Sequence, residues 1–396
     1  MKTVADVNFK GKKVLIRVDF NVPLNHNRQI TDDTRIRESL PTIQKVLDDG
    51  GTAILMSHLG RPKGGYEDDY SLTPIVPTLS SYLGRKVIFT RDLFGEKTKQ
   101  VASELKPGEV ALLENMRFYP EEEAGDEKFA KEIASIADAY VNDAFATAHR
   151  AHASTTTIAK YFPNDKYFGL LLANEIRNLD YVLNSSQPPF TALIGGAKVS
   201  SKLSIIKNLL NRVDNLIIGG GMAFTFLKAL GGKTGNSLIE EDKIEDAKYI
   251  INEAMRKGVN ILFPTDVIAA DGFSNDANFR EMEADNIDKD WMGLDIGKRT
   301  RRRYAEIINK SQTILWNGPM GVFELSNFKQ GTKAMAIAVS SATISGSYSL
   351  VGGGDSVAAI NQYNLADQIT YVSTGGGAML EYLEGKTLPG IKALME

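Results

Sequence analysis

Leu193-Ile194-Gly195-Gly196 is the first of four places in the second half of the chain where an apolar, strand-like run ends in glycines. The other three runs end at residues 219–221, 352–354 and 375–377. Glycine at the carboxyl end of a strand lets a ligand approach the backbone, and backbone N–H groups there can bind an anion. This half of the chain is therefore predicted to bind a nucleotide or another phosphate compound.

The comparable runs of the first half end in polar and basic side chains instead. They are Arg17-Val18-Asp19-Phe20-Asn21, Ser57-His58-Leu59-Gly60-Arg61, Glu114-Asn115-Met116-Arg117 and Asn142-Asp143. Arg35, Arg37 and Arg150 lie near the same predicted strand ends. Arginine binds phosphate and carboxylate through paired hydrogen bonds, so a converging subset would hold a small polyanion. Any one of these arginines could instead form a surface ion pair.

Strand-like runs alternate with helical stretches in both halves. In the first half the strand-like runs include residues 14–18, 53–56 and 110–113, and the helical stretches include residues 37–47, 73–83 and 127–136. This alternation predicts βαβ units and a mostly parallel sheet. We expect an α/β fold with two Rossmann-like domains, each a mostly parallel sheet flanked by helices, joined by a hinge helix. Ligands of such sheets bind outside the carboxyl ends of the strands, where both sets of special residues fall.

The hinge helix is predicted at residues 169–183. Its apolar residues recur at helical spacing, at Leu172, Ile176, Leu179 and Leu183. The polar and proline-containing residues 184–189 cannot continue the helix. The predicted division is a first domain at 1–168, a connecting helix and linker at 169–187, a second domain at 188–378 and a final segment at 379–396.

The composition is that of an ordinary enzyme-sized globular protein. The chain has 396 residues, 43% of them hydrophobic, and this length favours two domains over one. The formal net charge of −3 gives no support for nucleic-acid binding through bulk charge. Without cysteine there is no disulfide and no thiolate metal site. No signal peptide or membrane-spanning run is visible, so we expect a cytoplasmic protein without a membrane partner.

The standard nucleotide fingerprints are incomplete in this chain. A dinucleotide motif would need a further glycine at Phe224 after residues 219–221, or at Val357 after residues 352–354. Residues 232–234 end like a Walker A loop, but the position of its first glycine is Leu227. Neither a Rossmann dehydrogenase nor a P-loop protein explains the glycines.

Two lysines and one aspartate are candidate phosphate-binding groups. Lys198 and Lys202 follow Gly195 and Gly196 at a predicted helix start, spaced by four and so on one helical face. A helix N-terminus disfavours cations, so these lysines indicate an anion to be held; a pair of solvated lysines is the alternative. Asp355 follows a glycine triplet, where a carboxylate beside phosphates requires a cation such as Mg²⁺. Asp355 could also be a helix N-cap.

Other charged features are predicted to lie outside any site. The acidic residues 121–123 and the basic run 298–303 are interpreted as solvated surface. The spacing of His58, His149 and His152 matches no compact zinc pattern.

Nine motifs, in one order, resemble those of the phosphoglycerate kinase family. They are Arg17-Val18-Asp19-Phe20-Asn21-Val22-Pro23, Asp32-Asp33-Thr34-Arg35-Ile36-Arg37, Ser57-His58-Leu59-Gly60-Arg61-Pro62, Leu113-Glu114-Asn115-Met116-Arg117-Phe118, Ala148-His149-Arg150-Ala151-His152, Gly195-Gly196-Ala197-Lys198-Val199, Trp316-Asn317-Gly318-Pro319-Met320-Gly321-Val322-Phe323-Glu324, Gly352-Gly353-Gly354-Asp355-Ser356 and Ser373-Thr374-Gly375-Gly376-Gly377. One departure is Lys298 after Asp295-Ile296-Gly297, where many members have proline.

The resemblance implies reversible phosphoryl transfer from 1,3-bisphosphoglycerate to ADP, giving 3-phosphoglycerate and ATP, in glycolysis. It implies that the first domain binds the triose through Asp19, Phe20, Asn21, Arg35, His58, Leu59, Gly60, Arg61, Arg117 and Arg150. On the family pattern, Asp19 and Asn21 meet the glycerate end, and Arg35 reaches the reacting carboxylate. His58, Arg61, Arg117 and Arg150 would hold the non-reacting phosphate.

The same resemblance assigns the nucleotide to the second domain. Its implied contacts are Gly195, Lys202, Gly219, Gly293, Asn317, Glu324, Gly352, Gly353, Gly354, Asp355 and Ser356, with Asp355 on Mg²⁺ and ATP or ADP as co-substrate. Arg35, Lys198 and Gly376 would accompany the transferred group. The family pattern also returns the C-terminal segment to the first domain, and we expect a monomer. A two-lobed NAD-dependent dehydrogenase and a non-catalytic anion-binding protein remain alternatives.

Overall fold

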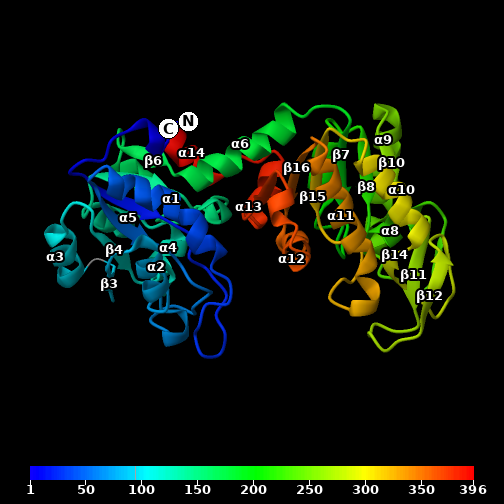
Figure 1. Cartoon of the computed structure of the whole chain (residues 1–396), viewed down its shortest axis with the longest axis horizontal. Helices are drawn as coiled ribbons and strands as arrows, with labels where there is room; N and C mark the ends of the chain where they lie inside the picture. The colour runs from blue at the N-terminus through cyan, green and yellow to red at the C-terminus, as the bar shows by residue number, and fades with distance from the viewer. Residues whose placement is uncertain (94) are drawn as a thin grey trace. The chain divides into compact units, whose positions relative to one another are not determined.

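The computed structural model describes residues 1–93 and 95–396, which form two compact units (Figure 1). The first unit contains Met1–Arg177 and Thr387–Glu396, and the second contains Asn178–Lys386. Each unit has its own six-stranded sheet with helices packed around it. Every neighbouring pair of strands in these two sheets is parallel, as the alternation of strand and helix patterns predicts.

The sheet of the first unit has the order β3-β4-β2-β1-β5-β6. Its strands are β1 (Lys13–Arg17), β2 (Thr52–Met56), β3 (Val87–Thr90), β4 (Val110–Leu113), β5 (Ala139–Asn142) and β6 (Lys166–Phe168). The helices of this unit are α1 (Thr34–Asp48), α2 (Ile75–Leu83), α3 (Glu96–Glu104), α4 (Pro120–Ala124), α5 (Glu127–Ala134) and α14 (Pro389–Met395). Because helices cover a parallel sheet, all residues of β2, β4 and β5 are buried.

The sheet of the second unit has the order β10-β8-β7-β15-β16-β17. Its strands are β7 (Phe190–Ile194), β8 (Asn215–Ile218), β10 (Asn260–Leu262), β15 (Thr313–Asn317), β16 (Tyr348–Gly352) and β17 (Tyr371–Ser373). The helices are α7 (Leu203–Leu209), α8 (Met222–Ala229), α9 (Ile244–Lys257), α10 (Lys298–Ile308), α11 (Gln330–Ile344), α12 (Gly354–Gln362) and α13 (Gly377–Leu383).

The second unit also contains an antiparallel sheet that the sequence patterns did not predict. It has the order β12-β11-β14, formed by β11 (Asp266–Ala270), β12 (Phe279–Glu283) and β14 (Met292–Ile296). A two-stranded sheet pairs β9 (Lys233–Thr234) with β13 (Asn286–Ile287). Phe224 and Leu227 of α8 pack with Val267 and Ala269 of β11 in a separate apolar cluster. Gly293 of β14 lies against the ring of Phe224 of α8, beside the pocket of the second unit that is described below.

The helix α6 (Leu170–Asn184) lies where the hinge helix was predicted, and the division between the units falls inside it, between Arg177 and Asn178. Its N-terminus is held by Asp143, whose carboxylate accepts a hydrogen bond of 3.2 Å from the N–H of Leu172. A Cβ on Gly169 would lie 2.1 Å from the same carboxylate, so only glycine fits at this approach. The first part of the helix is thereby attached to the end of β5.

The chain passes between the units a second time near its C-terminus. The helix α13 stays with the second unit, where the Asn208 side chain donates a hydrogen bond of 2.6 Å to the carbonyl of Leu383. Residues 387–396 belong to the first unit, and the N–H of Gly390 donates to the carbonyl of Ala148 at 2.9 Å. Residues 379–386 therefore lie with the second unit, and the segment that packs on the first begins at Thr387.

Candidate active site

Four neighbouring strand ends bring the predicted triose residues to one edge of the first sheet. The order β4-β2-β1-β5 places the segments that follow these strands side by side. Asp19 and Asn21 follow β1, and the N–H of Asn21 donates to the Asp19 carboxylate at 3.1 Å. The side chain of Asn21 accepts a hydrogen bond of 2.9 Å from the N–H of Gly60, which follows β2. These bonds join two strand ends into one surface.

The buried groups of this surface carry excess positive charge. Asp19 forms an ion pair of 2.5 Å with Arg35, whose side chain is 34% exposed. Arg117 donates to the carbonyl of Gly60 at 2.9 Å, and burial lowers the pKa of its guanidinium from the ordinary value. Burial, followed by the charges of Arg17 and Arg117, holds the pKa of His58 well below its usual range. His58 is therefore neutral at pH 7.

The remaining predicted arginines supply charge without a carboxylate partner. Arg61 is exposed and Arg150 is partly exposed, and no hydrogen bond or ion pair of either guanidinium is found in the described part of the chain. Burial lowers the pKa of His152 to about 3, and the charges of Arg117, Arg17 and Arg150 add to this effect. Uncompensated positive charge of this kind suits a small polyanion.

Phe20 and Leu59 of the predicted triose set are buried apolar residues, so their side chains offer no polar group to a ligand. Phe20 is fully buried in the apolar core of the first unit, and its N–H donates to the Ser57 hydroxyl at 2.8 Å. Leu59 is 4% exposed, and its carbonyl accepts a hydrogen bond from Asn115. Leu59 and Gly60 line a shallow pocket with Asn21 and Tyr70. Phe20 and Leu59 therefore shape the strand ends by packing.

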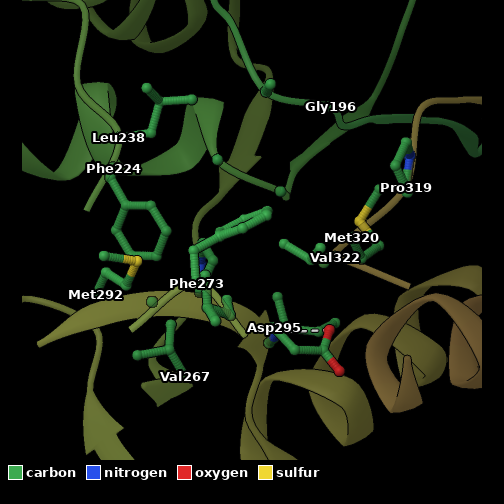
Figure 2. Close-up of a pocket in the computed structure, with 18 of the residues that line it drawn as sticks. Gly196, Phe224, Leu238, Val267, Phe273, Met292, Asp295, Pro319, Met320 and Val322 are labelled. Atoms are coloured by element: carbon green, nitrogen blue, oxygen red, sulfur yellow. Dashed lines mark hydrogen bonds between the residues drawn. The ribbon is translucent and has the colours of Figure 1, made fainter. Parts of the chain in front are cut away.

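The second unit contains a pocket of about 520 Å³ at the carboxyl ends of its strands (Figure 2). Six residues of the predicted set or of the glycine clusters line it, namely Gly196, Gly220, Gly221, Gly293, Glu324 and Asp355. Figure 2 shows Phe224, Leu238, Met292 and Val322 around the same space, which is mostly apolar. A Cβ on Gly293 would lie 2.1 Å from the ring of Phe224, so a side chain there would displace this wall. Such a pocket suits a flat, weakly polar ring.

Two predicted glycines face atoms of the loop after β15 instead of the pocket. A Cβ on Gly195 would lie 2.2 Å from the carbonyl oxygen of Pro319, and one on Gly219 would lie 2.3 Å from the sulfur of Met320. The loop after β15 therefore occupies the space beside these two glycines, where a ligand was predicted. These two glycines are required by close packing of that loop, which in turn forms one wall of the pocket.

A polar network joins the ends of β15 and β16. Lys202 donates to the side-chain oxygen of Asn317, and Asn317 donates to the carbonyl of Gly352 at 2.7 Å. The hydroxyl of Ser356 accepts a hydrogen bond of 2.6 Å from the N–H of Gly318. Burial lowers the pKa of Lys202, while the charge of Asp355 opposes this shift. The network holds the ammonium group of Lys202 beside the triplet Gly352, Gly353 and Gly354.

The prediction that Lys198 and Lys202 share one helical face is wrong. The helix α7 begins at Leu203, with Lys202 at its N-cap, and Lys198 lies in the loop before the turn that leads into this helix. Residues 195–196 are held by the loop after β15, since Gly196 donates to the carbonyl of Pro319 at 3.0 Å, and the helix starts only afterwards. Lys198 is exposed, so it stays available to a ligand.

Asp355 is the candidate metal ligand of this unit. It is exposed in the first turn of α12. The nearby Gly353 has a φ of +94°, a conformation that glycine adopts at low cost and other residues rarely adopt. Within residues 1–93 and 95–396, no three His, Cys, Asp or Glu side chains form a ready-made metal site. Mg²⁺ is commonly bound by one or two carboxylates together with substrate phosphates and waters, and a single exposed aspartate fits that mode.

The phosphoglycerate kinase family model matches residues 4–386 of the chain. The chain belongs to the phosphoglycerate kinase family. It is 51% identical to phosphoglycerate kinases of Porphyromonas gingivalis and Chlorobium luteolum, each over 99% of both chains. Among solved structures, phosphoglycerate kinase from Coxiella burnetii matches with a TM-score of 0.90 and 43% identity, covering 99% of this chain and 98% of that one. The enzyme from Pyrococcus horikoshii matches with a TM-score of 0.84 and 34% identity, covering 100% and 98%.

Membership of the phosphoglycerate kinase family confirms several predictions. The fold is α/β with two parallel six-stranded sheets. The activity is that of a phosphotransferase with a carboxyl acceptor, an ATP-binding kinase of glycolysis. The dehydrogenase and non-catalytic alternatives are thereby excluded. No helix of the described residues is both long and apolar enough to cross a membrane.

Asp295 is a pocket residue to which sequence reasoning gave no role. It is 3% exposed, and its carboxylate accepts hydrogen bonds from the N–H groups of Gly331 at 2.7 Å and Ile296 at 2.9 Å. Cβ atoms on Gly321 and Gly331 would each lie within 2.2 Å of this carboxylate. Asp295 therefore joins β14, the start of α11 and the loop that leads to Glu324. The motif around Asp295 was visible in the sequence, but its contacts come from distant segments.

Replacing Asp295 with asparagine should change how stability depends on pH. Burial raises the pKa of Asp295 to about 7. Between about pH 4 and 7 the unfolded carboxyl has lost a proton that the native one keeps, so native stability falls as pH rises. Asparagine does not titrate, so the variant does not lose stability in this way. The free energy of unfolding of Asp295→Asn minus that of the unsubstituted protein should therefore increase by up to about 4 kcal/mol as the pH rises from about 4 to 7. Denaturant unfolding at several pH values measures the slope.

The slope, and not the absolute stability, is the result to examine, because asparagine loses one acceptor at every pH. The exposed Asp285 supplies the control, and Asp285→Asn is measured in the same way. If the difference for Asp295→Asn varied with pH no more than that for Asp285→Asn, burial would not raise the pKa of Asp295.

Proposed function

We propose that the first unit binds the phosphoglycerate substrate and that the second unit binds the adenine nucleotide. The observation that carries this proposal is the contrast between the two sets of strand ends. One presents a cluster of arginines, of which Arg61 and Arg150 have no carboxylate partner in the described residues, and the other presents an apolar pocket bordered by Glu324 and Asp355. The first suits a compact polyanion, and the second suits a base with a ribose and phosphates attached. The reaction is then transfer of a phosphoryl group between 1,3-bisphosphoglycerate and ADP.

In the first unit, we assign the non-reacting phosphate to His58, Arg61, Arg117 and Arg150. Asp19 and Asn21 would form hydrogen bonds with the glycerate end of the substrate. The N–H of Asn21 donates to the Asp19 carboxylate, which supports the assignment of both residues to the same end of the ligand. Arg35 would reach the reacting carboxyl group. Phe20, Leu59 and Gly60 would shape this surface through packing and backbone groups.

In the second unit, we assign the base to the pocket bordered by Gly293 and backed by Gly195 and Gly219. Glu324 would bind the ribose hydroxyls. The phosphates would lie near Lys202, Asn317, Ser356 and the triplet Gly352, Gly353 and Gly354. Asp355 would hold Mg²⁺, which when bound neutralises phosphate charge. The polar network between β15 and β16 supports this assignment, because it keeps a lysine next to the triplet.

The chemistry of the reaction accounts for the residue types. The attacking oxygen belongs to a phosphate of ADP or, in reverse, to a carboxylate, and both are ionised at neutral pH. No general base is needed, so the protein has to orient two polyanions and stabilise charge on the moving group. Arg35, Lys198 and the backbone N–H groups near Gly376 are the groups we assign to that charge.

We retain the predicted domains at 1–168 and 188–378, joined by the connecting helix and linker at 169–187, as part of this proposal, with the returning C-terminal segment beginning at Thr387 instead of residue 379. A monomeric, cytoplasmic enzyme is part of the same proposal. The division between Arg177 and Asn178 within α6 supports a connecting helix, and the contact of Gly390 with Ala148 supports a C-terminal segment that returns to the first domain. Sedimentation of the purified protein measures the oligomeric state.

Crossed binding experiments test the assignment of ligands. Arg150→Ala should weaken 3-phosphoglycerate binding about tenfold or more, because it removes a charge-assisted hydrogen bond, and should leave ADP binding unchanged. Glu324→Gln should weaken ADP binding and leave 3-phosphoglycerate unchanged. Calorimetric titration of each variant with each ligand measures the four affinities. If either variant lost both ligands equally, or the two effects were exchanged, the assignment would be rejected.

A further inference from the structure

Arg17 lies beneath the proposed triose site and is fully buried at the end of β1. Its Nε donates a hydrogen bond of 2.8 Å to the Ser154 hydroxyl, and one terminal nitrogen donates to the carbonyl of Val18. The other terminal nitrogen lies 3.3 Å from Nδ1 of His58. No solvent reaches this guanidinium, so Arg17 cannot touch a ligand itself.

The chemistry of the guanidinium determines where the proton of His58 lies. Arginine has only donors, so the neighbouring Nδ1 of His58 must accept and must carry no hydrogen. A neutral imidazole without a proton on Nδ1 carries it on Nε2. The Asp19 carboxylate, which could stabilise a proton on Nδ1, lies 3.9 Å away, beyond hydrogen-bond distance.

The Nε side of the Arg17 guanidinium is also fixed by hydrogen bonds. Because the Ser154 hydroxyl accepts from Arg17, its own hydrogen is directed to the Glu122 carboxylate at 2.6 Å. The N–H of Ser154 donates to the second oxygen of Glu122 at 2.9 Å. Glu122 is fully buried in α4. Four segments distant in the sequence thus form one hydrogen-bonded chain, from His58 through Arg17 and Ser154 to Glu122.

Nε2 of His58 is the free end of this chain. It makes no hydrogen bond within the described residues, and it does not belong to their buried, unpartnered atoms. Burial lowers the pKa of His58 well below its usual range, and the charges of Arg17, Arg117 and Arg35 add to the shift. A group in this environment supplies a directed N–H without supplying a further positive charge.

We infer that Arg17 is a positioning residue that holds His58 in the Nε2–H form, so that His58 presents a neutral donor to a phosphate oxygen of the triose. The second half of this inference depends on the proposed function, which assigns His58 to that phosphate. One consequence is that His58 should neither gain nor lose a proton on triose binding between about pH 6 and 8.

Nitrogen-15 NMR of the histidine-labelled full-length chain tests the inference directly. The chain has 4 histidines, and loss of signals in His58→Gln identifies those of His58. We expect an unprotonated Nδ1 and a protonated Nε2, unchanged between about pH 5.5 and 8. A proton on Nδ1, or titration near the ordinary value of about 6.5, would overturn the inference.

Two variants separate the effect of Arg17 from general damage to the network. Arg17→Met removes the donor to Nδ1 and should produce mixed protonation or titration of His58. Ser154→Ala disrupts the other end of the chain but keeps that donor, so His58 should stay in the Nε2–H form. If Ser154→Ala altered His58 as much as Arg17→Met, or if neither altered it, the role of Arg17 would be disproved.

A pair of His58 variants keeps the test decisive if Arg17→Met fails to fold. The amide nitrogen of glutamine reaches the place of Nε2, whereas that of asparagine reaches only the place of Nδ1. His58→Gln should therefore bind 3-phosphoglycerate about tenfold more tightly than His58→Asn. Equal affinities, or the reverse order, would contradict a donor at Nε2.

Addition of 3-phosphoglycerate during the NMR experiment tests the proposed function separately. A shift of the Nε2–H signal on saturation supports contact with the triose. If binding were detected by calorimetry without any change at Nε2, the assignment of His58 to the ligand would fail, while the comparison of Arg17→Met with Ser154→Ala would still decide whether Arg17 sets the protonation of the ring.

Discussion

Arg35→Ala is expected to lower turnover by about 100- to 1000-fold while changing the affinity for ADP by less than about twofold. Arg35 forms an ion pair with Asp19, its side chain is 34% exposed, and we assign it to the reacting carboxyl group. A charge that acts on the transferred group contributes more in the transition state than in the bound substrate. Steady-state kinetics with coupled detection of ATP, together with calorimetric ADP titration, measures both quantities.

The neighbouring Arg37 provides a matched control. It is 53% exposed and pairs with Asp33, the N-cap residue of α1, outside the proposed triose surface. Arg37→Ala should therefore retain turnover. Because Arg35→Ala leaves the buried Asp19 without its ion-pair partner, circular dichroism and thermal unfolding should accompany the kinetics. Unchanged turnover in a folded Arg35→Ala protein would remove Arg35 from the catalytic set.

Asp355→Ala is expected to weaken binding of ADP in the presence of Mg²⁺ by about 10- to 100-fold, since loss of a direct carboxylate ligand should cost at least as much as loss of an outer contact. Without Mg²⁺, the substitution should leave ADP affinity unchanged or improve it, because a carboxylate repels phosphates. Binding of 3-phosphoglycerate should not change. Calorimetry with and without Mg²⁺ measures the difference.

Asp367 supplies the control for charge alone. It is an exposed aspartate of the same unit, outside the pocket and the glycine triplet. Asp367→Ala should leave all three affinities unchanged. Equal losses of ADP in both Mg²⁺ conditions for Asp355→Ala would point to a role as a structural cap of α12 and against a metal ligand.

Much of the fold could be predicted because it depends on local patterns. Alternating strand and helix runs indicated parallel sheets, and the stripe from Leu172 to Leu183 indicated α6 to within a residue at each end. The antiparallel strands β11, β12 and β14 were missed. β12 is largely exposed and lacks an apolar run, so its pairing with β11 left little signal in the sequence.

The residue types of the candidate site could also be predicted, but the structural role of some of these residues was predicted incorrectly. Gly195 and Gly219 were attributed to a ligand, whereas the loop from Gly318 to Met320 fills the space beside them. Lys198 and Lys202 were placed on one helical face, whereas α7 begins after both. These differences arise from the position of a loop that is distant in the sequence. The spacing of residues within a motif carries no information about that position.

The sequence by itself determined which kinds of ligand the two halves suit, because arginine-rich and glycine-rich strand ends differ in chemistry wherever they lie. It also determined the family, because nine ordered motifs do not require coordinates. Only the tertiary structure decided which groups are available. It buried Arg17 against His58, directed Asp295 to α11, and left Arg61 and Arg150 without carboxylate partners in the described chain. Burial and proton direction depend on contacts between distant segments, and these exist only in the folded chain.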